Sequence, residues 1–132
     1  MKRTIAAIMA AACILVFAAC GSGVTVGGFS SVYMNSDDFQ DAVDVLIRYF
    51  KDEMKGCTLE RIDYAKDSAV REEAEGLGKA PECVMVLEAA FTTDSSERTD
   101  GLESGKKYEK YRFILTRNTS AEPWEITDQR AQ

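Results

Sequence analysis

The sequence predicts an α+β fold in which one long amphipathic helix packs on a four-stranded antiparallel sheet, with a short second helix. Three observations favour this class. Apolar residues recur with helical spacing between positions 39 and 54, and apolar or alternating runs cover 57–64, 83–93 and 108–117. From position 83 onward, turn-type segments and not helices link these runs, so neighbouring strands are expected to run antiparallel.

The long helix is the clearest element of the sequence. Ser36 with Asp37 and Asp38 is a typical helix start, because a side-chain oxygen caps free N–H groups and acids in the first turn complement the helix dipole. Gly56 is the expected C-terminal stop. The apolar stripe, which we expect to face the core, consists of Phe39, Ala42, Val43, Leu46, Ile47, Phe50 and Met54.

Four strands account for most of the remaining apolar residues. The run 57–64 alternates with a one-residue slip near Arg61, which predicts a β-bulge. The run 83–93 is apolar on both faces and is typical of a central strand, 108–117 alternates again, and a last short strand begins at Trp124. Between them we expect a short exposed helix over 67–77 and a long polar loop over 94–107.

The N-terminus has the three parts of an export signal. Lys2 and Arg3 precede an uncharged apolar run over 4–19, which ends in small residues. A spanning helix needs about 20 apolar residues, so this run is short for a permanent membrane anchor. We therefore expect residues 1–19 to be a leader that directs export.

The string Phe17-Ala18-Ala19-Cys20 resembles the lipobox of bacterial lipoproteins. The resemblance implies cleavage before Cys20, lipidation of Cys20 and a location on the outer side of the cell membrane. Residues 20–35, rich in Gly and Ser, are then a lipidated N-terminus and flexible tether, with part of it around Val32 and Tyr33 docking on a single domain over 36–132. The alternative is a conventional signal or an uncleaved anchor, with Cys20 there by chance.

The composition of the chain disfavours some classes of partner and excludes some classes of chemistry. Removal of the leader leaves 113 residues with 14 Lys+Arg against 22 Asp+Glu, a net charge of −8, which disfavours nucleic acid as a partner. The chain has no histidine, which excludes histidine-based catalysis and imidazole ligation of metals. We expect one monomeric domain without metal, cofactor or catalytic residues.

Two cysteines remain in the expected mature domain, Cys57 and Cys83. Export permits a disulfide between them. If the strands that they open pair antiparallel, however, the two residues lie at opposite ends and too far apart for a Cα separation of about 5.5 Å. The alternative is two buried thiols that pack as small apolar side chains.

The segments FKDEMKGCTLERIDY, FTTD, KYEKYRFILTR and PWEITD together resemble small Firmicutes lipoproteins of unknown function, whose domains are similar to NTF2-like or cystatin-like α+β folds. The resemblance covers roughly residues 33–128. It implies a helix packed on a curved sheet. This chain is short of the three helices and long sheet of many NTF2-like domains, so a deep conical pocket is not expected.

Few residues suggest chemistry. Asp63, Tyr64 and Asp67 are the nearest to an acid/base cluster, but adjacent strand residues point to opposite faces. The acids of 94–103 lack the spacing of a calcium loop. Tyr108, Tyr111 and Trp124 form either an exposed interaction patch or cross-strand pairs that cover the sheet.

Three functions remain open. The first is a non-enzymatic, membrane-tethered accessory domain whose sheet face or 94–107 loop meets another envelope protein. The second is an NTF2-like small-molecule binder or enzyme, and the third, by analogy of architecture alone, is a cystatin-like inhibitor. A cavity of about 300 Å³ or more, closed by the helix and holding an unpaired carboxylate, favours the second, whereas a filled core with an exposed aromatic patch favours the first.

Overall fold

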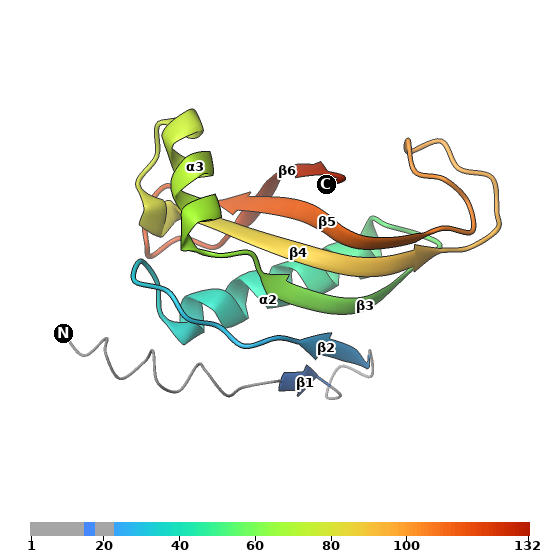
Figure 1. Cartoon of the computed structure of the whole chain (residues 1–132), viewed down its shortest axis with the longest axis horizontal. Coiled ribbons are helices and arrows are strands. Elements are labelled where there is room, and N and C mark those ends of the chain that lie inside the picture. The colour runs from blue at the N-terminus through green and yellow to red at the C-terminus, as the bar shows by residue number, and fades with distance from the viewer. Residues whose placement is uncertain (1–14, 18–22) are drawn as a thin grey trace.

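A computed structural model describes residues 15–17 and 23–132. It has one sheet with the strand order β1-β2-β3-β4-β5-β6, one long helix across one face and a short helix against the other face near one end (Figure 1). The predicted α+β class is confirmed. The predicted count of four strands is wrong, because β1 (Leu15–Phe17) and β2 (Val24–Val26) extend the sheet beyond β3.

The long helix α2 covers Ser36–Asp52. Its cap is Asn35, one residue earlier than predicted: Asn35 Oδ1 accepts from the backbone N–H of Asp38 at 2.9 Å, and Asp38 Oδ2 accepts from the N–H of Asn35 at 3.0 Å. This reciprocal capping box satisfies two N–H groups that the helix itself leaves free. The predicted apolar stripe faces the sheet, with Phe39, Ala42, Val43, Leu46 and Phe50 all buried.

The predicted strands and second helix are present with small changes at their ends. The strands are β3 (Cys57–Tyr64), β4 (Val84–Thr93), β5 (Lys107–Thr116) and β6 (Glu125–Arg130), and each pairs antiparallel with the next. The register of β3 shifts between Leu59 and Arg61, which confirms the predicted bulge. Helix α3 spans Asp67–Leu77. A 3-10 turn over Pro81–Cys83 delays the start of β4 to Val84, because proline favours the first turn of a helix.

The prediction of a flexible tether over 20–35 is wrong for most of that segment. Val24 and Val26 of β2 are 1% and 0% exposed, and Phe29 and Met34 are also buried. β2 pairs in parallel with β3, and α2 supplies the long crossover that a parallel pair requires. A Gly- and Ser-rich composition suggested flexibility, but the four apolar side chains find partners far away in the sequence. Within residues 23–35, the fold thus begins at the start of β2.

The predicted leader is mostly outside the described residues, and so are Cys13 and Cys20. Of the predicted leader, the structure describes only β1, which pairs antiparallel with β2. A cut before Cys20 would separate β1 from the domain and leave β2 as the edge strand of the sheet. Within residues 15–17 and 23–132, no helix combines the length and the hydropathy needed to cross a bilayer.

The core has two unequal halves. On the α2 side, Phe50 packs against Phe91 and Phe113, with ring centroids 5.1 and 5.5 Å apart. On the other side, α3 buries Ala69, Val70 and Ala74. Because α3 is short, it covers only one end of its face (Figure 1). The sheet beside it carries the charged side chains of Glu88 and Arg112.

Candidate functional site

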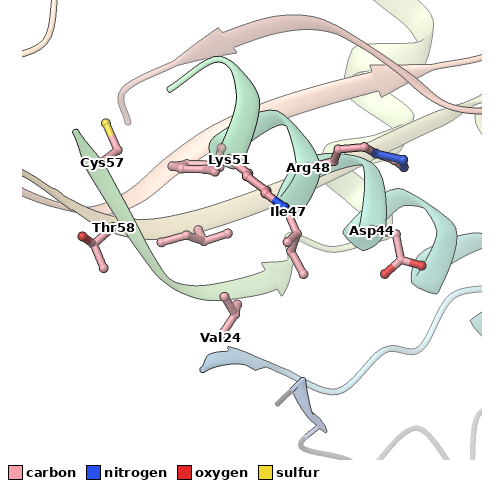
Figure 2. A pocket seen from close by; sticks show the side chains of 9 residues that line it. Val24, Asp44, Ile47, Arg48, Lys51, Cys57 and Thr58 are labelled. Carbon is pink, nitrogen blue, oxygen red and sulfur yellow. The ribbon is translucent and has the colours of Figure 1, made fainter. Parts of the chain in front are cut away.

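A groove of about 770 Å³ lies between the C-terminal half of α2 and the first residues of β2 and β3. Figure 2 shows Val24 from β2, Ile47, Arg48 and Lys51 from α2, and Thr58 from β3 around it. The four other lining residues are Asp44, Phe50, Cys57 and Leu59. No pattern in the sequence marks this groove, because its walls come from three separate segments.

Side chains of the groove divide into an apolar floor and a polar rim. Val24, Phe50 and Leu59 are buried and form the floor. Arg48 and Lys51 are exposed at the rim, and neither makes an ion pair with any residue that the structure describes. The groove therefore combines apolar contact area with two cations that are available to an anion.

A catalytic carboxylate is not evident in this groove. Asp44 is its only acid; the side chain is exposed and accepts a hydrogen bond from Gln40 Nε2 at 3.3 Å. An exposed acid lacks the burial that tunes a general base. The volume that would favour a small-molecule binder is thus present, whereas the unpaired carboxylate is not.

The predicted cluster Asp63, Tyr64 and Asp67 divides between two faces of the sheet, as alternation requires. Asp63 receives two hydrogen bonds from Arg61, at 2.7 and 2.9 Å. Tyr64 donates to Asp67 at 2.5 Å, and Asp67 also accepts from the backbone N–H of Val32. Burial, followed by the bond to Asp67, raises the pKa of the Tyr64 hydroxyl, so it stays protonated and acts as a donor. The Tyr64–Asp67 pair holds the segment before α2 in place.

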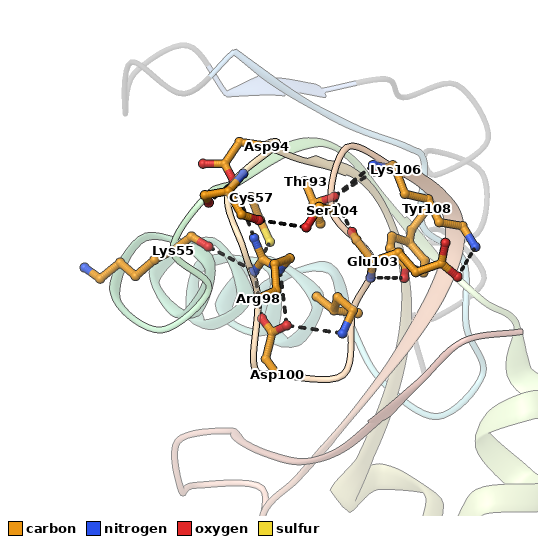
Figure 3. A network of polar contacts seen from close by, with 12 residues as sticks. Lys55, Cys57, Thr93, Asp94, Arg98, Asp100, Glu103, Ser104, Lys106 and Tyr108 are labelled. Carbon is orange, nitrogen blue, oxygen red and sulfur yellow. Dashed lines mark hydrogen bonds and ion pairs between the residues drawn. The ribbon is translucent and has the colours of Figure 1, made fainter.

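The polar loop between β4 and β5 is organised around Arg98, whose side chain is 6% exposed (Figure 3). Its guanidinium donates to the backbone carbonyl of Lys55 at 3.0 Å, to Asp100 at 2.7 Å and to the Cys57 sulfur at 3.4 Å. The bond from Arg98 is the main reason that the pKa of Asp100 lies below its usual value. An arginine at this position was not singled out in the sequence, because only the folded loop brings it back to the end of α2.

Cys57 and Cys83 are both free thiols. Cys57 pairs with Thr93 at the far end of β4, while Cys83 directly precedes the first residue of β4. Ten strand residues span about 30 Å, so the possible disulfide between them is excluded. Burial raises the pKa of the Cys57 thiol despite the opposing effect of Arg98, so the sulfur is a thiol and not a reactive thiolate at neutral pH.

The predicted aromatic patch of Tyr108, Tyr111 and Trp124 does not exist as an exposed surface. Tyr111 and Trp124 are 9% and 4% exposed, and Tyr108 is half-buried. Tyr108 stacks on Phe91 at 5.1 Å, and the Trp124 ring lies under the guanidinium of Arg117 at 4.0 Å. The alternative of cross-strand pairing holds for the tyrosines, since Tyr108 pairs with Phe91 and Tyr111 with Ala89 of β4. Trp124 is buried because its indole N–H reaches the backbone carbonyl of Asp38 at 3.0 Å.

Charged side chains form a network on the sheet face beside α3. Arg112 of β5 lies 3.7 Å from Glu73 of α3 and 3.5 Å from Glu88 of β4, and Glu73 also pairs with Arg130 of β6. The network ties α3 to three strands. Across the described part of the chain, no group of three or more Cys, Asp or Glu side chains is placed to hold a metal ion.

Comparisons with known proteins add no family. No family model, no curated protein and no solved structure matches this chain.

Proposed function

We propose that this protein is an exported lipoprotein, held by lipid on Cys20 at the outer side of the cell membrane, and that its α+β domain is a non-enzymatic accessory or interaction domain. One observation carries the proposal: the uncharged apolar run ends directly before Cys20, and the first strand after Cys20 begins at Val24. Each buried methylene of an attached acyl chain contributes about 0.8 kcal/mol, so two or three chains anchor almost permanently.

The engagement of the candidate acid/base groups supports a non-enzymatic role. Asp63 is held by Arg61, Tyr64 is a protonated donor to Asp67, and Asp67 is needed to fix the segment at Val32. Groups that are already committed to structural hydrogen bonds are poorly placed to exchange protons with a substrate.

The anchor is tested by Cys20→Ala, with Cys13→Ala as the matched control, because both remove a cysteine from the same segment. Cells are fractionated and the protein is weighed intact by mass spectrometry. We expect wild type and Cys13→Ala to give a chain that starts at position 20 and carries acyl mass. We expect Cys20→Ala to lack that mass and to be mislocalised. Wild-type protein with its leader intact, or without a fatty chain, overturns the proposal.

The accessory role is tested by affinity capture of the lipidated protein from its own membrane. We expect one envelope protein to be recovered reproducibly. Capture that recovers no reproducible partner counts against an interaction role.

The groove supports a second candidate, a small-molecule binder of the kind that the NTF2-like resemblance implies. Its volume of about 770 Å³ falls within the range of ligand pockets. Native mass spectrometry of freshly purified protein tests it: a small molecule that stays bound to wild type and is lost in Ile47→Asp supports a binder. An empty groove in every preparation favours the accessory role.

A further inference from the structure

We propose that the groove between α2 and the start of β2 is the face by which the domain contacts its own membrane, and that Arg48 and Lys51 bind the phosphate groups of anionic phospholipids there. The inference rests on the proposed lipid anchor. It adds an orientation of the domain and a ligand class, anionic headgroups, for this groove.

The length of chain between anchor and domain supports this placement. Four residue steps separate Cys20 from Val24, and a fully extended chain covers at most about 14 Å over that distance. Val24 lines the groove. A lipid on Cys20 therefore holds the groove within about 14 Å of the membrane surface, since only residues 20–23 remain of the tether that the sequence predicted.

The fold places the C-terminal half of α2, which carries Arg48 and Lys51, beside residues of β2 and β3. β2 runs parallel to β3, with Thr25 beside Arg61 and Val26 beside Ile62, so β2 lies beside the middle of β3. β3 follows the end of α2 after a short turn at 53–56. Val24, the first residues of β3 and the last turns of α2 consequently line one groove, and Figure 2 shows Ile47 between Val24 and Lys51.

The lining of the groove differs in charge from the whole domain, because it holds Arg48 and Lys51 against one acid, Asp44. The mature chain has a net charge of −8 and is repelled by an anionic membrane. Arg48 and Lys51 are spaced three residues apart on one side of α2, are exposed, and make no ion pair with the described residues. Two unpaired cations beside an apolar floor suit a phosphate with glycerol and acyl carbons behind it.

The test uses lysine acetylation of the lipidated protein on vesicles, measured by mass spectrometry. Lys51 is the reporter in the groove, and Lys110 is an exposed reference on β5. Vesicles contain either phosphatidylcholine alone or an added third of phosphatidylglycerol. Two cations near an anionic surface favour contact by up to about 30-fold, so the Lys51/Lys110 rate ratio should fall by up to that factor on anionic vesicles.

Two variants of equal charge change separate local contact from net charge. Arg48→Glu should restore the ratio measured on phosphatidylcholine, whereas Lys66→Glu, at the opposite end of β3, should leave the protection unchanged. Equal ratios for wild type on both vesicles overturn the docking proposal. Protection that Lys66→Glu abolishes as completely as Arg48→Glu also overturns it.

Failure of the anchor and failure of the docking have different outcomes. Protein that does not float with either vesicle contradicts the lipid anchor. Protein that floats but shows no change in the ratio contradicts only the docking. If dissolved glycerol phosphate protects Lys51 as well as anionic vesicles do, the groove binds a free phosphate ester, and its assignment to the membrane is wrong.

Discussion

Phe29 distinguishes a docked N-terminal segment from a flexible tether. Its ring stacks on Phe39 with centroids 4.6 Å apart and meets the edge of Tyr64 at 4.8 Å, and the residue is 8% exposed. Truncation of a buried phenylalanine to alanine costs about 3–5 kcal/mol. Because the site lies at one end of the core, where neighbours can partly close the space, we expect Phe29→Ala to lower the free energy of unfolding by about 3 kcal/mol.

Urea unfolding, followed by the fluorescence of Trp124, measures this loss. The protein has a single tryptophan, and it is 4% exposed, so its emission reports on the loss of the core. With a urea dependence of about 2 kcal/mol per molar, a loss of about 3 kcal/mol lowers the midpoint by about 1.5 M. Phe29→Leu, which keeps most of the apolar volume, should fall between wild type and Phe29→Ala.

Val32 is the matched control in the same segment, since its side chain is 82% exposed. Val32→Ala should stay within about 0.5 kcal/mol of wild type, as is usual for surface substitutions. If Phe29→Ala also stays within that range, residues 24–34 are a tether after all. The linker between Cys20 and the folded domain would then be longer than four residues, and the proposed membrane contact of the groove would lose this support.

Three further predictions follow from the loop and the cysteines. After unfolding in denaturant, the mature protein should show two thiols per chain that react with a thiol reagent, Cys57 and Cys83. A count of zero would contradict their separation by a strand of about 30 Å. Arg98→Ala should increase amide hydrogen exchange in residues 94–106 without a comparable rise in β5, because Arg98 joins the loop to the end of α2; unchanged exchange would show that the loop holds its shape without it. The pKa of Asp100 is lowered in the folded state, chiefly by the hydrogen bond from Arg98, so its contribution to loop stability is present above the unfolded pKa and is lost as pH falls through the lower, folded pKa. The protection factors of the loop amides, which correct each exchange rate for its intrinsic pH dependence, should therefore fall in acid in wild type, and less so in Asp100→Asn, which lacks this titration.

Local patterns in the sequence were sufficient for most of the domain. The stripe from Phe39 to Met54 identified α2, the slip near Arg61 identified the bulge, and the glycines and acids of 67–77 identified α3. Each of these signals depends on neighbours within a few residues, where hydrophobic periodicity and capping act directly. The N-cap is Asn35 and not the predicted Ser36, because both residues have suitable side-chain oxygens and only the backbone geometry selects between them.

Contacts between distant segments decided the remainder. The three residues of β2 are too short to identify as a strand; they become one because β3 offers a ladder and α2 supplies the crossover. The same pairing creates the groove, since Val24, Lys51 and Leu59 meet only when β2 lies beside β3. Trp124 is buried under Arg117, which no local pattern indicates. The sequence by itself thus determined the elements and the predicted anchor at Cys20. Only the tertiary structure decided which side chains surround Val24, because that surface depends on burial and pairing between segments far apart in the chain.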